Sequence, residues 1–150
     1  MHLIDKECIL FDILVTSKYQ AIKTMVQKLS CIGSITGEEE FYRDVLNRED
    51  ICATAIGDEI ALPHGRTRNV LRPSICFGRL LEPVVWNEKT QEKVRFVILI
   101  AVPSEGATEF HLKIISQLAR KLMHREYRAI LLNGTQEEVY KFLNESIVMN

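Results

Sequence analysis

Phe96-Val97-Ile98-Leu99-Ile100-Ala101-Val102 is the most apolar stretch of the chain, and it carries no polar residue on either face of a strand. A strand that meets water on one face alternates apolar and polar residues, whereas a strand covered on both faces is continuously apolar. We therefore expect residues 94–102 to form the central strand of a sheet. The stretch is far shorter than the roughly 20 residues that a membrane-spanning helix needs.

Outward from this strand, apolar runs predict further strands over residues 51–62 and 75–81. Elsewhere, apolar residues spaced three and four positions apart predict helices. Capping-box pairs mark three helix starts: Ser17 with Gln20, Thr36 with Glu39, and Thr135 with Glu138. The predicted helices cover residues 18–30 with a break at Gly33, the segment from Gly37 to Arg48, the segment after Thr108, and residues 127–132 and 136–144. In the third of these, the predicted core stripe is Leu112, Ile115, Leu118, Ala119 and Leu122.

The order of helices, strands and helices favours an α/β domain over an all-β or all-α one. With 150 residues, 47% of them hydrophobic, the chain is long enough to bury a core without disulfides or metal. We expect residues 1–150 to form a single domain of α+β sandwich-like character, in which helices flank a central mixed β-sheet. Ile147 and Val148 are apolar positions that would pack either internally or against a second copy, so a homo-oligomer stays open.

Charge and cysteine content exclude several classes of protein. The 19 basic and 20 acidic residues give a net charge of −1, which argues against nucleic acid as the main partner. The four cysteines contain no C-x-x-C pair and lie in apolar surroundings, so we expect buried reduced thiols. With no signal peptide or membrane-spanning segment evident, we expect a cytoplasmic protein.

The run Ala61-Leu62-Pro63-His64-Gly65-Arg66 carries the main chemical signal. Pro63 lacks a backbone N–H and is expected to end sheet pairing, and Gly65 permits close approaches that a Cβ would forbid. The pattern predicts an exposed His64 at a bend. A neutral imidazole there is suited to covalent group transfer, proton transfer or metal binding, and an ordinary loop histidine remains the alternative.

Two other residues are candidates for the same site. His111 lies at the start of the helix after Thr108, where free N–H groups favour an anion such as a phosphoryl group, or where the ring is simply satisfied by the cap. Arg48 ends the second predicted helix and either supplies charge beside His64 or complements the helix dipole. Arg66, Arg68 and Arg72 form a local basic patch that is either solvated or steers an acidic partner.

Several chemistries lack their residue patterns. The chain has no Walker-type phosphate loop, no G-x-G-x-x-G turn, no H-E-x-x-H pair and no G-x-S-x-G elbow. A metal site would require His64 to meet His111 or His124 with carboxylates nearby, which the spacing does not favour. We therefore assign no cofactor and no metal.

Taken together, these motifs resemble the fructose/mannitol-type enzyme IIA domains of the bacterial sugar phosphotransferase system, with their nitrogen-related regulatory relatives. The resemblance covers nearly the whole chain. Its signature is an arginine, a Thr/Gly/Ile/Gly-like stretch and A-[IL]-P-H-G, found here as Arg48, Thr54-Ala55-Ile56-Gly57 and Ala61-Leu62-Pro63-His64-Gly65. The strand that ends at Pro103 and the segment His111-Leu112-Lys113 with Leu118 match the family's central strand and H-L-x-x-L-x-x-L helix.

The resemblance implies a phosphotransferase component with the type 2 IIA fold. His64 would accept a phosphoryl group from phospho-HPr and pass it to a IIB component that works with a membrane IIC permease, for sugar uptake. Arg48 and His111 would stabilise the phosphate, and His111 would also orient the ring. The alternative is a regulatory nitrogen-type IIA protein, in which phosphorylation of His64 controls binding to a transporter, kinase or transcription regulator.

Two residues depart from the family pattern. Ala55 and Glu59 stand where glycines are frequent, and Glu59 adds negative charge near His64. Because no IIB, IIC or HPr-like segment fits within 150 residues, we expect a free-standing IIA whose partners are separate chains.

Overall fold

The computed structural model describes residues 3–105 and 108–146, and in the helix that begins at Thr108 it describes side chains from residue 112 onward. The described residues form five helices and six strands, all strands in one sheet. The elements are β1 (Ile4–Ile13), α1 (Lys18–Cys31), α2 (Glu38–Ile51), β2 (Ala55–Gly57), β3 (Ile60–Ala61), β4 (His64–Thr67), β5 (Ser74–Asn87), β6 (Glu92–Pro103), α3 (Thr108–Lys121), α4 (Arg125–Asn133) and α5 (Gln136–Ser146).

Strand β6 lies at the centre of the sheet, as its sequence predicts. It pairs antiparallel with β5 on one side and parallel with β3 and β4 on the other, in the strand order β1-β5-β6-β3-β2. Residues 97–102 are at most 1% exposed. The sheet is mixed, because β1 pairs parallel with β5 while β2 pairs antiparallel with β3.

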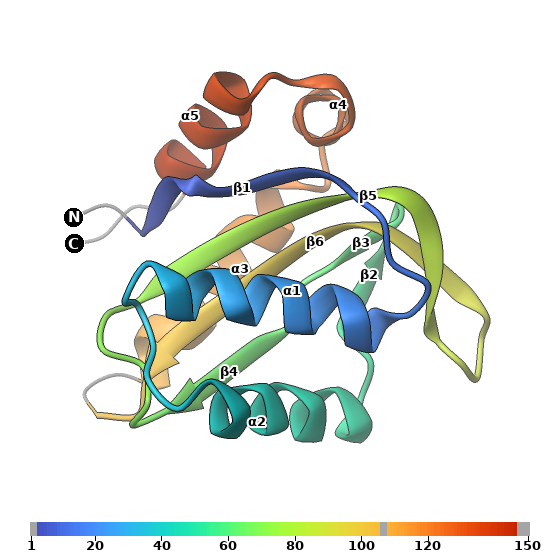
Figure 1. The fold of residues 1–150 in the computed structure, drawn as a ribbon. Coiled ribbons are helices and arrows are strands. Elements are labelled where there is room, and N and C mark those ends of the chain that lie inside the picture. Colours follow the sequence, from blue (N-terminus) through green and yellow to red (C-terminus); the bar gives the residue numbers. More distant parts are fainter. Residues whose placement is uncertain (1–2, 106–107, 147–150) are drawn as a thin grey trace.

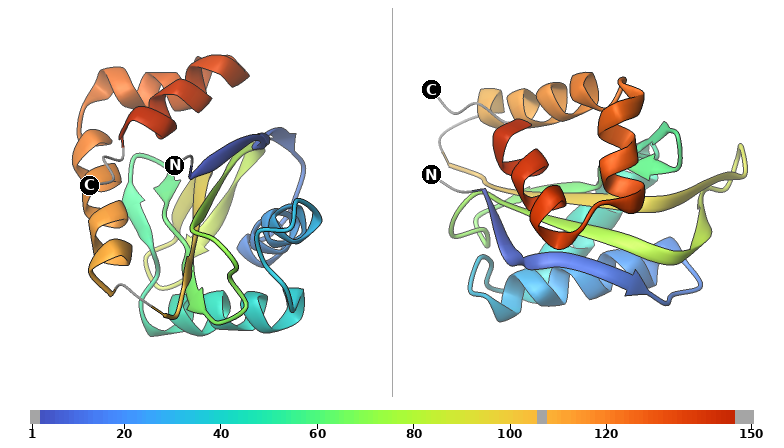
Figure 2. Two further views of the ribbon diagram at one scale, coloured as in Figure 1. Left: turned by 90° about the vertical axis from the view of Figure 1, so that its left-hand side faces the viewer. Right: turned by 90° about the horizontal axis from the view of Figure 1, so that it is seen from above.

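Helices cover both faces of this sheet, as Figures 1 and 2 show. Helices α1 and α2 lie on one face, and α3, α4 and α5 lie on the other. The predicted architecture of a mixed sheet flanked by helices is confirmed. No helix in the described part of the chain is both long and apolar enough to cross a membrane.

Of the three predicted capping boxes, the one at Thr135 is complete and the one at Ser17 is partial. The Ser17 hydroxyl accepts a hydrogen bond from Gln20 N at 3.2 Å, but Gln20 Oε1 accepts from Thr16 N at 2.8 Å. The Thr135 hydroxyl accepts from Glu138 N at 3.2 Å, and Glu138 accepts from Thr135 N at 3.0 Å. The box at Thr36 is wrong, because Thr36 N donates instead to Asn69 O at 2.8 Å and α2 is preceded by Gly37 without a side-chain cap.

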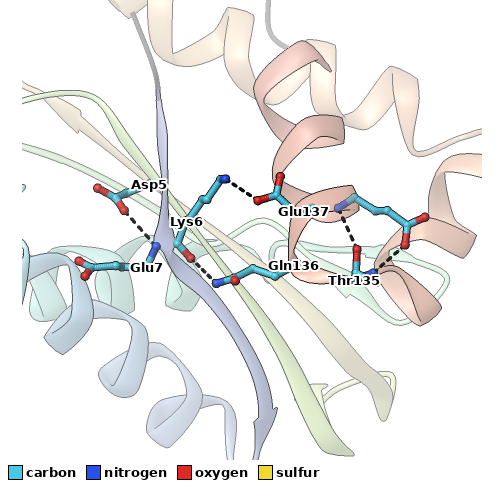
Figure 3. Close-up of polar contacts among 7 residues, drawn as sticks. Asp5, Lys6, Glu7, Thr135, Gln136 and Glu137 are labelled. Atoms are coloured by element: carbon cyan, nitrogen blue, oxygen red, sulfur yellow. Dashed lines mark hydrogen bonds and ion pairs between the residues drawn. The ribbon is translucent and has the colours of Figure 1, made fainter.

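Strand β1 is missing from the sequence-based prediction. Its first residues are charged and its burial does not alternate, so period-two reasoning finds no strand. Pairing with β5 and contact with α5 hold it in place. Gln136 Nε2 donates to Lys6 O at 2.8 Å and Lys6 pairs with Glu137 across the same boundary (Figure 3).

Three other predictions need correction. The strand expected from residue 51 is instead the end of α2 followed by the short hairpin of β2 and β3, and β5 runs well beyond residue 81. In α3 and the residue after it, Ile114, Leu118 and Leu122 are buried, whereas Leu112 is 62% exposed. The predicted stripe is therefore confirmed at Leu118 and Leu122 and half-buried at Ile115 and Ala119. It is wrong at Leu112 and misses Ile114, because the buried positions are spaced by four from 114 to 122. Ile147 and Val148 lie outside the described residues.

The four cysteines are all free thiols. Cys8 and Cys76 are buried, as expected, but Cys31 and Cys52 are exposed. Neither exposed cysteine lies in a strand: Cys31 ends α1, and Cys52 follows the last residue of α2.

Strands β3 and β4 run along β6 in one continuous register. Ile60 pairs with Phe96 and His64 with Ile100, so the offset is 36 residues in both strands. Pro63 interrupts the strand but still accepts a hydrogen bond from Ile100 N at 2.9 Å. The expectation that Pro63 ends sheet pairing is therefore wrong, because proline removes only the donor and leaves the carbonyl.

Gly65 permits α2 to pack directly on β4. A Cβ at Gly65 would lie 2.7 Å from Phe41 Cε1 and 3.0 Å from Val45 Cγ2, and both side chains are fully buried. The predicted close approach at Gly65 is confirmed.

Gly65→Ala should destabilise the protein because its methyl group overlaps the buried Phe41 ring. We expect a loss of about 1–3 kcal/mol in the free energy of unfolding, typical of overpacked cores, measured by urea denaturation. Adding Phe41→Leu, which removes the overlapping ring atom, should restore part of that loss. Equal stability of Gly65→Ala and wild type would contradict this account.

In the β2–β3 turn, introducing a glycine should stabilise the protein, the opposite of replacing Gly65. Asp58 and Glu59 adopt left-handed backbone conformations, with φ of 53° and 63°. Glu59→Gly should raise the free energy of unfolding by about 0.5–1 kcal/mol, because relief of left-handed strain exceeds the entropy cost of glycine. Glu59→Ala is the matched control: it removes the same carboxylate but keeps the Cβ, so it should not stabilise.

Candidate phosphorylation site

His64 is the first residue of β4, directly after the interruption at Pro63. Its side chain is only 8% exposed, so the prediction of an exposed histidine at a bend is wrong. The reason is the resumed pairing with β6, which draws residue 64 into the sheet. The ring nevertheless lines a cleft of about 630 Å³, together with residues from α2 and α3.

A backbone hydrogen bond fixes the protonation of the His64 ring. Nδ1 lies 2.9 Å from Leu62 O, and a carbonyl oxygen can only accept. In the neutral ring, Nδ1 therefore carries the proton and Nε2 carries the lone pair. This tautomer makes Nε2 the nucleophilic nitrogen.

One face of α2 forms a wall of the cleft. Asp44, Asn47, Arg48 and Ile51 line it, at the i, i+3, i+4, i+7 spacing of a single helical face. Residues one position further round this helix, Phe41 and Val45, are buried against β4. The core packing of α2 thus determines where Arg48 lies relative to His64.

Arg48 is held at the C-terminal end of α2. Its Nη1 donates to Cys52 O at 2.8 Å, which satisfies a carbonyl just past the last helical residue. Both sequence-based readings of Arg48 therefore apply: it caps the helix end, and it lines the cleft with His64.

The pKa of His64 is lowered from its usual 6.5. Burial is the largest cause, because it disfavours the charged imidazolium, and the Arg48 charge acts in the same direction. The hydrogen bond to Leu62 O and the carboxylates of Glu49 and Asp44 oppose the shift. The ring is consequently more fully neutral near pH 7 than a histidine in water.

Helix α3 forms the opposite wall through Leu112 and Ile115. His111 precedes Leu112 on this helix, so the structure brings its segment to the cleft. The His111 side chain lies outside the described residues.

The predicted basic patch divides between different surroundings. Arg66 lines the cleft, where its Nη2 donates to Ser104 O at 2.9 Å. Arg68 lines an adjoining hollow with Arg43, and Arg72 donates instead to Ser34 Oγ at 3.2 Å.

His124 precedes α4 as its N-cap, which confirms the predicted helix junction. Among the described residues, no group of histidine, cysteine and carboxylate side chains has metal-site geometry.

Sequence reasoning missed two acidic residues. Asp44 accepts a hydrogen bond from Arg66 N at 3.0 Å and lines the cleft one helical turn before Arg48, a spacing that does place it there. Glu49 is 3% exposed, and its carboxylate accepts from Thr54 N and from Trp86 Nε1. Nothing in the sequence pairs Glu49 with a tryptophan 37 residues away.

Comparison with known proteins gives relatives of one kind. The E. coli fructose-like EIIA component of a phosphotransferase system is 30% identical over 147 residues, covering 98% of this chain and 99% of the relative. Other curated relatives are much longer, and the chain spans only 14–21% of them.

Two solved structures share the fold closely. The nitrogen regulatory protein IIA-Ntr from Neisseria meningitidis matches with a TM-score of 0.85 and 28% identity, covering 94% of this chain and 96% of that one. The E. coli mannitol enzyme IIA, in its complex with phosphorylated mannitol enzyme IIB, matches with a TM-score of 0.79 and 26% identity, covering 94% and 98%.

The family model described as "Phosphoenolpyruvate-dependent sugar phosphotransferase system, EIIA 2" matches residues 2–146. That span includes β4, α2 and α3, the three elements that line the cleft around His64. The chain therefore belongs to the EIIA type 2 family of the sugar phosphotransferase system.

Proposed function

We propose that the protein is a phosphocarrier that accepts a phosphoryl group from phospho-HPr on Nε2 of His64 and passes it to a IIB component for sugar uptake. The observation that carries the proposal is the bond from His64 Nδ1 to Leu62 O, which leaves the lone pair on Nε2 beside the cleft that Arg48 lines. Neutral imidazole is a nucleophile for group transfer, and an arginine fork suits phosphate oxygens.

The transfer balances without a cofactor. The Nε2 lone pair forms the new bond to phosphorus as the bond between phosphorus and the donor nitrogen breaks and returns its electron pair to that nitrogen. Nδ1 of the imidazole keeps its proton and donates it in the hydrogen bond to Leu62 O. In-line phosphoryl transfer depends mainly on positioning and on charge that stabilises the equatorial oxygens. Arg48 supplies that charge, with His111 as the second proposed stabilising group.

The rim of the cleft fits a protein partner better than a small molecule. Ile51 on α2 is 81% exposed and Leu112 on α3 is 62% exposed, one on each wall. Exposed apolar side chains around a functional cleft are typical of interaction surfaces. Phospho-HPr and IIB would dock here in turn in the cytoplasm, and the mannitol IIA–IIB complex among the structural relatives supports a IIB acceptor.

A regulatory role is the second candidate. The nitrogen regulatory protein from Neisseria meningitidis shares the fold with a TM-score of 0.85, whereas the fructose-like EIIA component has 30% sequence identity over nearly its full length. In the regulatory case the same phosphorylation of His64 would change affinity for a transporter, kinase or transcription regulator.

Intact-mass spectrometry tests the phosphocarrier proposal. Incubation with phosphoenolpyruvate, enzyme I and HPr should add one acid-labile phosphoryl group, and His64→Ala should abolish it. His124→Ala removes a histidine outside the cleft and should leave the adduct unchanged. No adduct on folded wild type would contradict the proposal. Passage of the label to a IIB protein separates transport from regulation.

The pH dependence follows from the lowered pKa of His64. Because burial and Arg48 favour the neutral ring, the acid limb of kcat/KM for phosphorylation should have its midpoint below 6.5. Arg48→Gln removes a cause of the lowering and should move that midpoint upward. Arg43→Gln removes an exposed charge from the same helix and should leave it in place. NMR titration of His64 should give a higher pKa in Arg48→Gln than in wild type and Arg43→Gln. An unshifted midpoint in Arg48→Gln would refute the role given to the Arg48 charge.

A further inference from the structure

Glu49 is a buried charge that the phosphoryl-transfer scheme above does not use. It is 3% exposed and is not among the residues that line the His64 cleft. An uncompensated buried carboxylate is costly, so its partners indicate why it is there. Glu49 accepts from Trp86 Nε1 at 2.6 Å, and both of its oxygens accept from Thr54 N at 3.2 Å.

The Trp86 end of this arrangement is buried in the core. Trp86 lies in β5, at a register shift between Val85 and Asn87, and is fully buried, and its carbonyl accepts from Lys18 Nζ at 2.9 Å. Glu49 therefore connects a buried side chain of β5 to the backbone of Thr54. Charge-assisted hydrogen bonds of this kind are shorter and stronger than neutral ones.

The Thr54 end leads to His64 in two further hydrogen bonds. Thr54 O accepts from Leu62 N at 3.1 Å, and Leu62 O accepts from His64 Nδ1 at 2.9 Å. The segment that ends at Thr54 also contacts Arg48, whose Nη1 donates to Cys52 O at 2.8 Å. Residues 52–54 thus hold both groups that the proposed transfer requires.

We propose that Glu49 is a positioning residue for phosphoryl transfer. By accepting from Thr54 N and Trp86 Nε1, it fixes segment 52–54. That segment orients Arg48 through Cys52 O, and through Leu62 it fixes the Nδ1–H tautomer of His64. The catalytic part of this proposal rests on the phosphocarrier function. The structural part, control of the His64 tautomer, does not.

Two variants separate the links of this network. Glu49 Oε1 accepts from both Trp86 Nε1 and Thr54 N, whereas Oε2 accepts from Thr54 N alone. Glu49→Gln removes the negative charge, and whichever oxygen the amide nitrogen replaces, that nitrogen opposes the Thr54 N–H. Trp86→Phe keeps an aromatic ring but removes the indole donor together with the volume of the five-membered ring. Asp50→Asn is the matched control, since it removes one negative charge from the adjacent, exposed position of α2.

The first readout is the His64 tautomer in the unphosphorylated protein, from ¹⁵N chemical shifts of the ring. Wild type and Asp50→Asn should show Nδ1 protonated in the neutral ring. Glu49→Gln and Trp86→Phe should show a mixture with the Nε2–H form. A structural role that only adds stability would lower the melting temperature without changing the tautomer.

The second readout is transfer from phospho-HPr. In both variants kcat should fall on the order of tenfold, the size of effect expected when a reacting group is slightly misplaced. KM should stay unchanged, because the cleft rim is intact. The double variant should lose less than the product of the two single losses, since both break one network.

Wild-type tautomer and rate constants in both Glu49→Gln and Trp86→Phe would overturn the proposal. If Glu49→Gln does not fold, Trp86→Phe decides the outcome by itself. Failure of wild type to accept a phosphoryl group would refute the phosphocarrier function alone, because the tautomer measurement still tests the positioning role.

Discussion

Parallel pairing with β6 is the constraint on which the site depends. Residues 60–61 and 64–67 follow β6 at one constant offset, and the register pairing with β6 is interrupted at Leu62 and Pro63. Within that gap the Leu62 carbonyl is available to the His64 ring two residues later instead of to a neighbouring strand. Proline is usually unfavourable within a sheet. Here it follows the residue whose carbonyl, Leu62 O, is the acceptor that sets the tautomer.

Opposing groups act on the pKa of His64, and those that lower it prevail. Burial and Arg48 favour neutral His64, whereas the Leu62 carbonyl, Glu49 and Asp44 favour the imidazolium. In the proposed transfer, the neutral ring acts as the nucleophile and then carries the phosphoryl group. Arg48 would serve both stages, because its charge lowers the pKa of the ring and its guanidinium is matched to phosphate oxygens.

The sequence was sufficient for the features that depend on local pattern. The apolar run of residues 96–102 identified the central strand, and the caps at Ser17 and Thr135 located two helix starts. Strand β1 could not be found, because it is held by β5 and α5 rather than by its own periodicity. The exposure of His64 was misjudged because strand pairing resumes after Pro63. That pairing is made with β6, whose Ile100 lies 36 residues after His64, so the sequence around His64 does not reveal it. Glu49 was missed because its partner Trp86 is distant in sequence.

The two walls of the cleft belong to helices on opposite faces of the sheet, α2 on one and α3 on the other. A protein that docks at this cleft as proposed would contact both helical layers at once. A chain in which either layer has detached offers only half of that surface. Under the proposed function, docking would therefore require that both layers are folded, and a partly unfolded copy would receive no phosphoryl group.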